Sequence, residues 1–232
     1  MTTEALRSEL AGQAPETVLR RAWEAFGEGL VFATSLAAED QVITEMIARN
    51  RWPIPLVTLD TGRLFPETYD LLAETERRYG VRIRVFFPDR AAVEAMVAES
   101  GINLFRDSVA SRKRCCQVRK VEPLRRALAP YAAWICGLRR GQSVTRAEVS
   151  EVEDDAANGL VKINPLAAWS EGQVWGTIAA RGIPYNPLHD RGYPSIGCAG
   201  CTRAVRRTED VRAGRWWWEE PEQKECGLHR GS

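Results

Sequence analysis

The chain has 232 residues, of which 44% are hydrophobic, and a formal net charge of +1. This composition supports a packed core and argues against disorder, and the length suits one generous domain or two small ones. With a net charge so close to zero, no global field steers the chain to nucleic acid or to a membrane, and neither is expected as a partner.

Two features of the sequence bear on the compartment in which the protein works. No apolar run reaches the roughly 18 residues that a membrane span needs. Residues 1–16 are polar and lack the basic and apolar regions of a signal peptide. We therefore expect a cytoplasmic protein, in which thiols are kept reduced.

Short apolar runs alternate with helical patterns through the first half of the chain. Strands are predicted at 30–33, 55–59, 81–86 and 132–136, and helices at about 41–50, 67–79 and 91–99. This alternation favours an α/β fold in which a parallel twisted sheet is flanked by helices. Ligands of such folds bind beyond the carboxyl ends of the strands, so segments 34–40, 60–62 and 137–143 should converge on one site.

The second half of the chain is less regular. A helix is expected at 169–181, with Ser170 as its N-cap. Beyond it Gly and Pro are frequent, which indicates an irregular C-terminal segment folded over the active site. We predict one domain, 1–232, with a core at about 28–206 and a mobile segment at about 207–232.

The sequence contains six cysteines, Cys115, Cys116, Cys136, Cys198, Cys201 and Cys226. In a cytoplasmic chain of this size, metal binding or redox catalysis is favoured over a disulfide framework. Cys136 lies in an apolar strand and is interpreted as a core residue.

Four of these cysteines form two pairs, Cys115-Cys116 and Cys198-x-x-Cys201. Four thiolates are enough for a tetrahedral zinc ion or an iron–sulfur cluster, and the spacing leaves both open, although an adjacent pair is unusual for zinc. Basic residues surround the first pair, where they would offset the charge of a cluster and favour thiolates: Arg112, Lys113, Arg114, Arg119 and Lys120.

Cys226 stands apart in the motif Lys224-Glu-Cys-Gly-Leu-His229. Chain ends are usually accessible to solvent, so this thiol suits a nucleophile. An unused thiol on a tail is an equally good interpretation of these features alone.

Taken together, the two cysteine pairs and the 224–229 motif resemble the assimilatory, thioredoxin-dependent adenylyl-sulfate reductases, over about 30–229. The resemblance implies an adenine-nucleotide α-hydrolase, or PP-loop-like, fold. It implies that Cys115, Cys116, Cys198 and Cys201 hold a [4Fe-4S] cluster and that Cys226 attacks the sulfur of adenosine 5′-phosphosulfate. A separate thioredoxin or glutaredoxin is the implied reductant, and a homo-oligomer is compatible with the sequence.

Eight further residues are expected to bind the substrate. Ser35 lies in a strand-to-helix turn whose N–H groups could hold an oxyanion, and Asp60 and Gly62 follow the next strand. Paired arginines after the fourth strand suit phosphate or sulfate. These are Arg139 and Arg140, and the resemblance adds Lys120, Arg212 and Arg215.

The implied reaction passes through an enzyme S-sulfocysteine on Cys226, from which thioredoxin releases sulfite. Three alternatives stay open. One is a reductase of 3′-phosphoadenosine 5′-phosphosulfate, although relatives of that kind generally lack the cluster cysteines. Another is a PP-loop ATP-dependent sulfur-transfer enzyme acting on tRNA, against which the degenerate loop at 34–40 speaks. The third is a redox sensor that binds zinc or a cluster.

Overall fold

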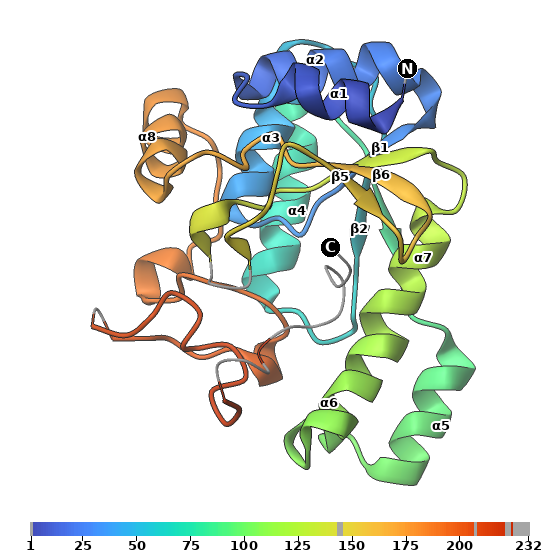
Figure 1. The fold of residues 1–232 in the computed structure, drawn as a ribbon. Coiled ribbons are helices and arrows are strands. Elements are labelled where there is room, and N and C mark those ends of the chain that lie inside the picture. Colours follow the sequence, from blue (N-terminus) through green and yellow to red (C-terminus); the bar gives the residue numbers. More distant parts are fainter. Residues whose placement is uncertain (1, 143–145, 207, 221–223, 225–232) are drawn as a thin grey trace.

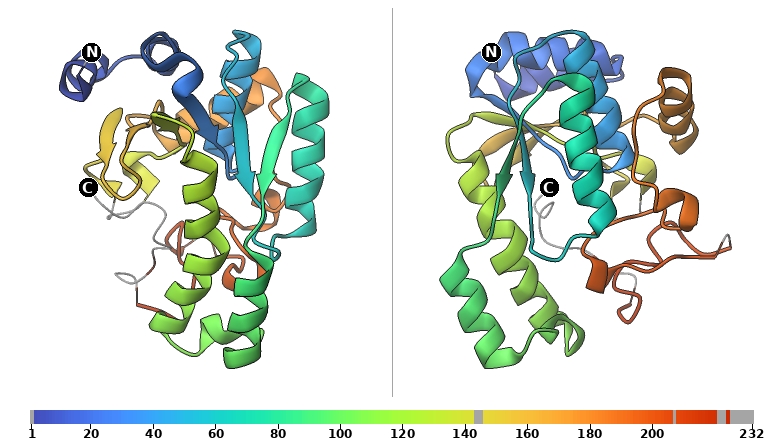
Figure 2. Two further views of the ribbon diagram at one scale, coloured as in Figure 1. Left: turned by 90° about the vertical axis from the view of Figure 1, so that its right-hand side faces the viewer. Right: turned by 180° about the vertical axis from the view of Figure 1, so that it is seen from behind.

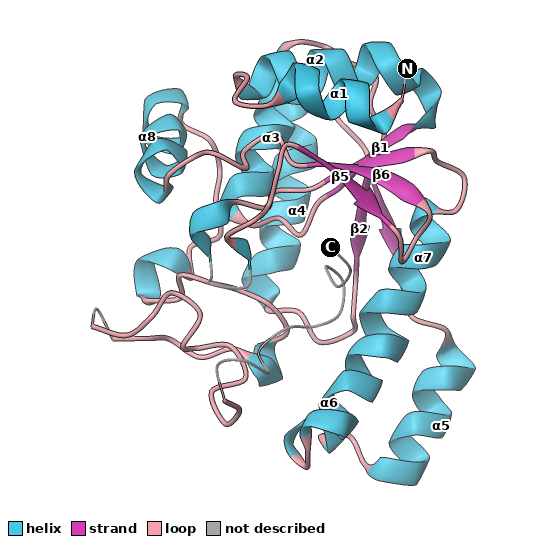
Figure 3. Ribbon diagram, viewed as in Figure 1, coloured by secondary structure: helices cyan, strands magenta, loops and turns pink. Residues whose placement is uncertain are grey.

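The computed structural model describes residues 2–142, 146–206, 208–220 and 224. Six strands form one sheet, in the order β3-β2-β1-β4-β6-β5. All neighbouring strands are parallel except β5, which runs antiparallel to β6. Figure 3 shows this sheet enclosed by helices, which confirms the predicted α/β class. The strands are β1 (Leu30–Ala33), β2 (Leu56–Leu59), β3 (Ile83–Phe86), β4 (Ala133–Ile135), β5 (Val152–Asp155) and β6 (Leu160–Ile163).

Helices cover both faces of the sheet (Figures 1 and 2). One core contains side chains from α1 (Thr3–Leu10), α2 (Pro15–Phe26), α3 (Ala38–Arg49), α4 (Pro66–Tyr79) and α8 (Glu171–Arg181). On the other face, α7 (Glu122–Leu128) packs against β2 and β3. Two helices, α5 (Arg90–Ser100) and α6 (Val109–Cys116), extend beyond the carboxyl ends of the parallel strands.

The alternation of side chains along β1 explains why this apolar run is a strand. Leu30 and Phe32 point into the core with α3 and α4, whereas Val31 points to the opposite face and packs with Leu124 of α7. Successive side chains of a strand leave on opposite faces, so a strand covered on both sides is apolar throughout.

Several elements were not predicted from the sequence. These are α1 and α2, the hairpin of β5 and β6, and the long helical stretch that runs from α6 to α7. The sequence of β5, Val-Glu-Asp-Asp, does not look like a strand, yet Asp155 at its end accepts a hydrogen bond from Trp134 Nε1 at 2.9 Å. No helix among the described residues is long and apolar enough to cross a lipid bilayer.

Candidate active site

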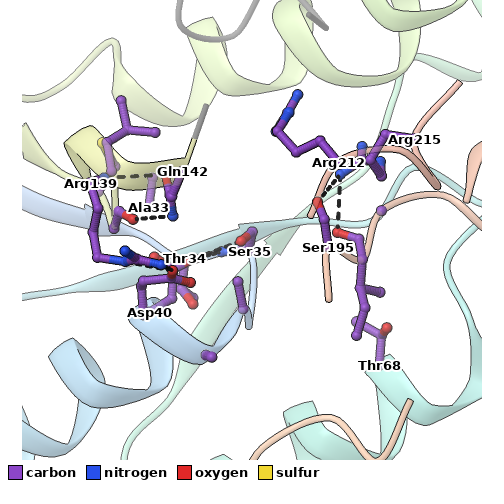
Figure 4. Close-up of a pocket in the computed structure, with 18 of the residues that line it drawn as sticks. Ala33, Thr34, Ser35, Asp40, Thr68, Arg139, Gln142, Ser195, Arg212 and Arg215 are labelled. Atoms are coloured by element: carbon purple, nitrogen blue, oxygen red, sulfur yellow. Dashed lines mark hydrogen bonds and ion pairs between the residues drawn. The ribbon is translucent and has the colours of Figure 1, made fainter. Parts of the chain in front are cut away.

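A cavity of about 270 Å³ opens at the carboxyl ends of β1, β2 and β4. Ligands of open α/β sheets bind at this end of the strands. Residues from the three segments that should converge line it, namely 34–35 and 37–40 after β1, Thr61 after β2, and 136–139 with Gln142 after β4. Figure 4 shows the loop after β1 on one side of the cavity and two arginines of the C-terminal segment on the other.

The loop after β1 is closed by an internal carboxylate. Ser35 donates both its backbone N–H and its hydroxyl to the same oxygen of Asp40, each at 2.6 Å. Asp40 is buried, and burial raises its pKa to about 6 even though the two hydrogen bonds from Ser35 oppose the change. Ser35 therefore lines the cavity as expected for a substrate-binding residue, but its donors are engaged by Asp40.

The two adjacent arginines after β4 differ in their surroundings. Arg139 lines the cavity and forms an ion pair with Glu39 at 2.8 Å, with both side chains largely buried. Arg140 is not among the lining residues, since its guanidinium donates to the carbonyl of Val149 and faces Glu151. The structure thus separates two residues that the sequence suggested as a pair.

Asp60 and Gly62 stabilise the loop after β2 but do not line the cavity. Asp60 accepts hydrogen bonds from the Gly62 N–H at 2.7 Å and from the Tyr69 hydroxyl at 2.9 Å. Gly62 has φ of +69°, a conformation that favours glycine. Thr61, between them, faces the cavity.

The four paired cysteines come together from two segments. Cys115 and Cys116 end α6, and a π-helical turn, Gln117–Val121, leads from them into α7. Cys198 and Cys201 flank a short turn, in which the Cys201 N–H donates to the Cys198 carbonyl. All four are buried in a single cluster of side chains that also contains Phe105 and Trp216.

One cysteine of this cluster also borders the cavity. The Cys198 sulfur lies 3.3 Å from the Thr61 hydroxyl, and the Lys120 side chain hydrogen-bonds to it. Burial raises the pKa of Cys198, but the charge of Lys120 and the contact with Thr61 outweigh it, so the net pKa is lowered. Burial instead raises the pKa of Cys201 to about 12. Lys120 and Cys198 both line the cavity, which therefore reaches the cysteine cluster.

The C-terminal segment supplies two further cations to the cavity. Arg212 donates to the carbonyl of Lys224 at 2.8 Å. Arg215 is buried and donates to the Ser195 hydroxyl at 3.3 Å and to the Ile196 carbonyl at 3.4 Å. Cys226, the predicted nucleophile, lies outside the described residues.

Sequence reasoning missed two lining residues with chemistry of their own. Arg146 adds a cation, and its side chain donates to the Gln142 oxygen at 2.6 Å. His189 packs edge-to-face on Trp175 with ring centroids 5.1 Å apart, and burial lowers its pKa. Neither position belongs to a motif, and only the folded chain brings them to the cavity.

The amino-acid sequence of the chain is similar to those of known proteins. Residues 29–204 match the model of the phosphoadenosine phosphosulfate reductase domain. The adenosine 5′-phosphosulfate reductase of Allochromatium vinosum is 61% identical over 203 residues, which cover 88% of this chain and 79% of that protein.

Solved structures point the same way. The crystal structure of a phosphoadenylyl-sulfate reductase from Candida auris, a phosphate complex, superposes with a TM-score of 0.75 at 30% identity, covering 88% of this chain and 96% of that one. Yeast FAD synthetase in complex with FAD, at 16% identity and a TM-score of 0.55, shares the fold over 87% of this chain and 65% of its own.

Proposed function

The chain belongs to the phosphoadenosine phosphosulfate reductase domain family, and on that premise we propose that it reduces adenosine 5′-phosphosulfate to sulfite and AMP in assimilatory sulfate reduction. It is an oxidoreductase of the adenylyl-sulfate reductase type. Its reductant is a dithiol protein of the thioredoxin or glutaredoxin kind, and the reducing cytoplasm, which keeps such thiols reduced, is its compartment.

The observation that carries the proposal is the position of the cysteine cluster. The four buried cysteines lie in one cluster, and this cluster reaches the cavity through Cys198. Cationic side chains also line the cavity, and they suit a substrate with one phosphate and one sulfate charge. These are Lys120, Arg139, Arg146, Arg212 and Arg215.

The residues around the four cysteines fit a [4Fe-4S] cluster. Buried N–H groups there lack an acceptor among the described residues, including Arg119 Nε, Trp216 Nε1 and Trp218 Nε1. An anionic cluster offers the sulfur acceptors that such donors need, since buried donors are otherwise costly.

The two metal sites that four cysteines could form differ in how the thiolates are used. A tetrahedral zinc site draws four sulfurs onto one ion, whereas each thiolate of a cluster binds a different iron. The cluster would supply negative charge beside the cavity and hold the two cysteine segments together.

The chemistry is a transfer of a sulfuryl group to Cys226. Its thiolate attacks the sulfate sulfur, the bond from that sulfur to the phosphate oxygen breaks, and AMP leaves with the electron pair. The cations of the cavity stabilise the charge on AMP.

The S-sulfocysteine left on Cys226 is then resolved by the reductant. One thiolate of the reductant attacks the Cys226 sulfur and expels sulfite, and its second thiol releases Cys226 by closing the disulfide. The dithiol loses two electrons and the sulfate sulfur gains two, so the reaction balances.

Intact-mass measurement tests the proposal. Anaerobically purified protein mixed with adenosine 5′-phosphosulfate, without reductant, should gain one SO₃ group. The adduct should be absent from Cys226→Ser and present in Cys136→Ser, which loses a buried thiol instead. No adduct in the wild type, or sulfite release at full rate by Cys226→Ser, would refute it. Steady-state rates with 3′-phosphoadenosine 5′-phosphosulfate distinguish the two nucleotides.

A further inference from the structure

One residue connects the helix of the first cysteine pair to the C-terminal segment. Arg112 lies one helical turn before Cys116, and its side chain hydrogen-bonds to that cysteine. It also donates two hydrogen bonds to Glu219, from Nε at 3.0 Å and from Nη2 at 2.7 Å. The ion pair is fully enclosed, with side chains 0% and 2% exposed.

Trp216 strengthens this connection. Two guanidinium groups contact its ring, with Arg112 Cζ 4.7 Å and Arg215 Cζ 4.8 Å from the ring centroid. The backbone N–H of Trp216 donates to the carbonyl of Cys201, so this part of the chain also contacts the second cysteine pair. Trp216 and Arg215 line the cavity, and the contacts of Arg112 therefore extend from Cys116 to the cavity wall.

We propose that Arg112 is a positioning residue that makes the placement of the C-terminal segment depend on the state of the cysteine helix. Glu219 lies seven residues before Cys226 in the sequence, so this ion pair holds the last described stretch of chain before the nucleophile. This inference rests on the proposed function and on the proposed cluster.

The physical reason is that a buried bidentate pair tolerates little displacement. A guanidinium and a carboxylate removed from water are stable only while their geometry is kept. Arg112 is fixed at Cys116, and any movement of this helix end on loss of the cluster shifts Arg112 relative to Glu219. The pair then weakens, and the segment that begins at Trp216 loses its buried anchor.

Tryptic cleavage after Lys224 reports on this anchor without substrate or turnover. The Lys224 carbonyl is held by Arg212 in the folded protein, which protects the adjacent bond. Mass spectrometry of peptide 225–230 follows this cleavage, since trypsin also cuts after Arg230. We expect cleavage after Lys224 to be at least ten-fold faster in Glu219→Gln and in the double variant Arg112→Met/Glu219→Met. The double variant removes both charges, so it is expected to fold even if the single variant does not.

The chain offers a matched control on the same helix. Arg114 pairs with Glu99 on the surface, where the side chains are 44% and 64% exposed. Arg114→Gln should leave cleavage after Lys224 within two-fold of the wild type. Equal cleavage in the wild type, the double variant and this control would overturn the proposal.

A second comparison tests the dependence on the cluster. Stripping iron from the wild type with an anaerobic chelator should accelerate cleavage after Lys224. In Arg112→Met/Glu219→Met the same treatment should accelerate cleavage after Lys224 by less than two-fold, because the ion pair is already absent. Equal acceleration in both proteins would show that the cluster acts on the segment by another route and would overturn the proposal.

Kinetics separate positioning from substrate binding. In Arg112→Lys, which keeps the charge and loses the planar contacts, kcat should fall at least ten-fold while the KM for the nucleotide changes by less than three-fold, and iron content should stay at the wild-type level. A rise in KM alone, or loss of iron alone, contradicts the positioning role. The proteolysis experiments need no nucleotide, so a negative result there would overturn the role of Arg112 and leave the reductase proposal intact. Conversely, if the bond after Lys224 is protected as expected but the protein makes no sulfite, only the reductase proposal is refuted.

Discussion

Both donors of Ser35 point at Asp40, so the strand-to-helix loop carries its own carboxylate where an anion-binding loop is expected. The Asp40 side chain is held from a second direction by the backbone of Gly137, at the end of β4. The donors of this loop are therefore occupied by the buried carboxylate of Asp40.

The titration of Asp40 should be visible in the stability of the protein. Burial raises its pKa to about 6 from 3.8, so the folded protein keeps this proton to a higher pH than the unfolded chain. Stability is therefore lost as the pH rises through about 6. Relative to Asp40→Asn, the wild type should lose about 2 kcal/mol of unfolding free energy between about pH 4 and pH 8, measured by urea unfolding. If the unfolding free energies of the two proteins change with pH in parallel, the raised pKa of Asp40 is contradicted.

A methyl group at Gly137 should disturb the same loop. A Cβ there would lie 2.3 Å from an Asp40 oxygen and 3.0 Å from the Glu39 Cβ. We expect Gly137→Ala to destabilise the protein by about 1–3 kcal/mol and to raise the KM for the nucleotide. Gly176 in α8 has open space around it, so Gly176→Ala should be neutral or stabilising by up to about 1 kcal/mol. Thermal unfolding of the pair measures the difference, and equal melting temperatures would speak against the clash.

Two arginines near the end of β4 should differ in their effect on substrate binding. Arg146 lines the cavity, whereas Arg140 is engaged by Glu151 and the Val149 carbonyl. Loss of a hydrogen bond to a charged group costs about 1.5–3 kcal/mol, so Arg146→Gln should raise KM by roughly 10- to 100-fold. Arg140→Gln should change KM by less than about three-fold. The reverse order in steady-state assays would restore Arg140 as the binding residue.

Lys120 should affect the proposed cluster through its charge. It hydrogen-bonds to Cys198 and faces the cavity. Replacing a cation beside an anionic cluster by a neutral side chain disfavours reduction, so Lys120→Met should make the cluster's midpoint potential more negative by on the order of 100 mV. Redox titration followed by electron paramagnetic resonance measures this. Arg114→Gln, a surface change on α6, serves as the control, and an unchanged potential in Lys120→Met would exclude direct electrostatic contact.

The sequence was sufficient to predict the parallel sheet because its strands are covered on both faces. Such strands are continuous apolar runs, as in Leu30–Ala33, and the helices between them are long and periodic. The β5–β6 hairpin escaped prediction because its first strand is acidic and is stabilised by tertiary contacts such as that of Asp155 with Trp134. Propensity does not report such contacts.

The cysteine site was predictable from motif and spacing, whereas the cavity lining was only partly so. Residue type and position after a strand suggested Arg139 and Arg140 equally, and only the partner of each side chain distinguishes them. Likewise, Asp60 and Gly62 follow the correct strand but turn to Tyr69 and to each other. Where a polar side chain points is decided by its neighbours, which the sequence does not display.

The π-helical turn at Gln117–Val121 allows one continuous helix to serve two neighbours. A wider turn shifts the angular phase of every residue that follows, so the two sides of the turn need not share a face. Cys115 and Cys116 can thus look toward the 198–201 turn while Leu124 and Leu128 look toward the sheet. Shortening this stretch by one residue would rotate one end against the other by roughly 100°, and no choice of side chains could then satisfy both neighbours at once.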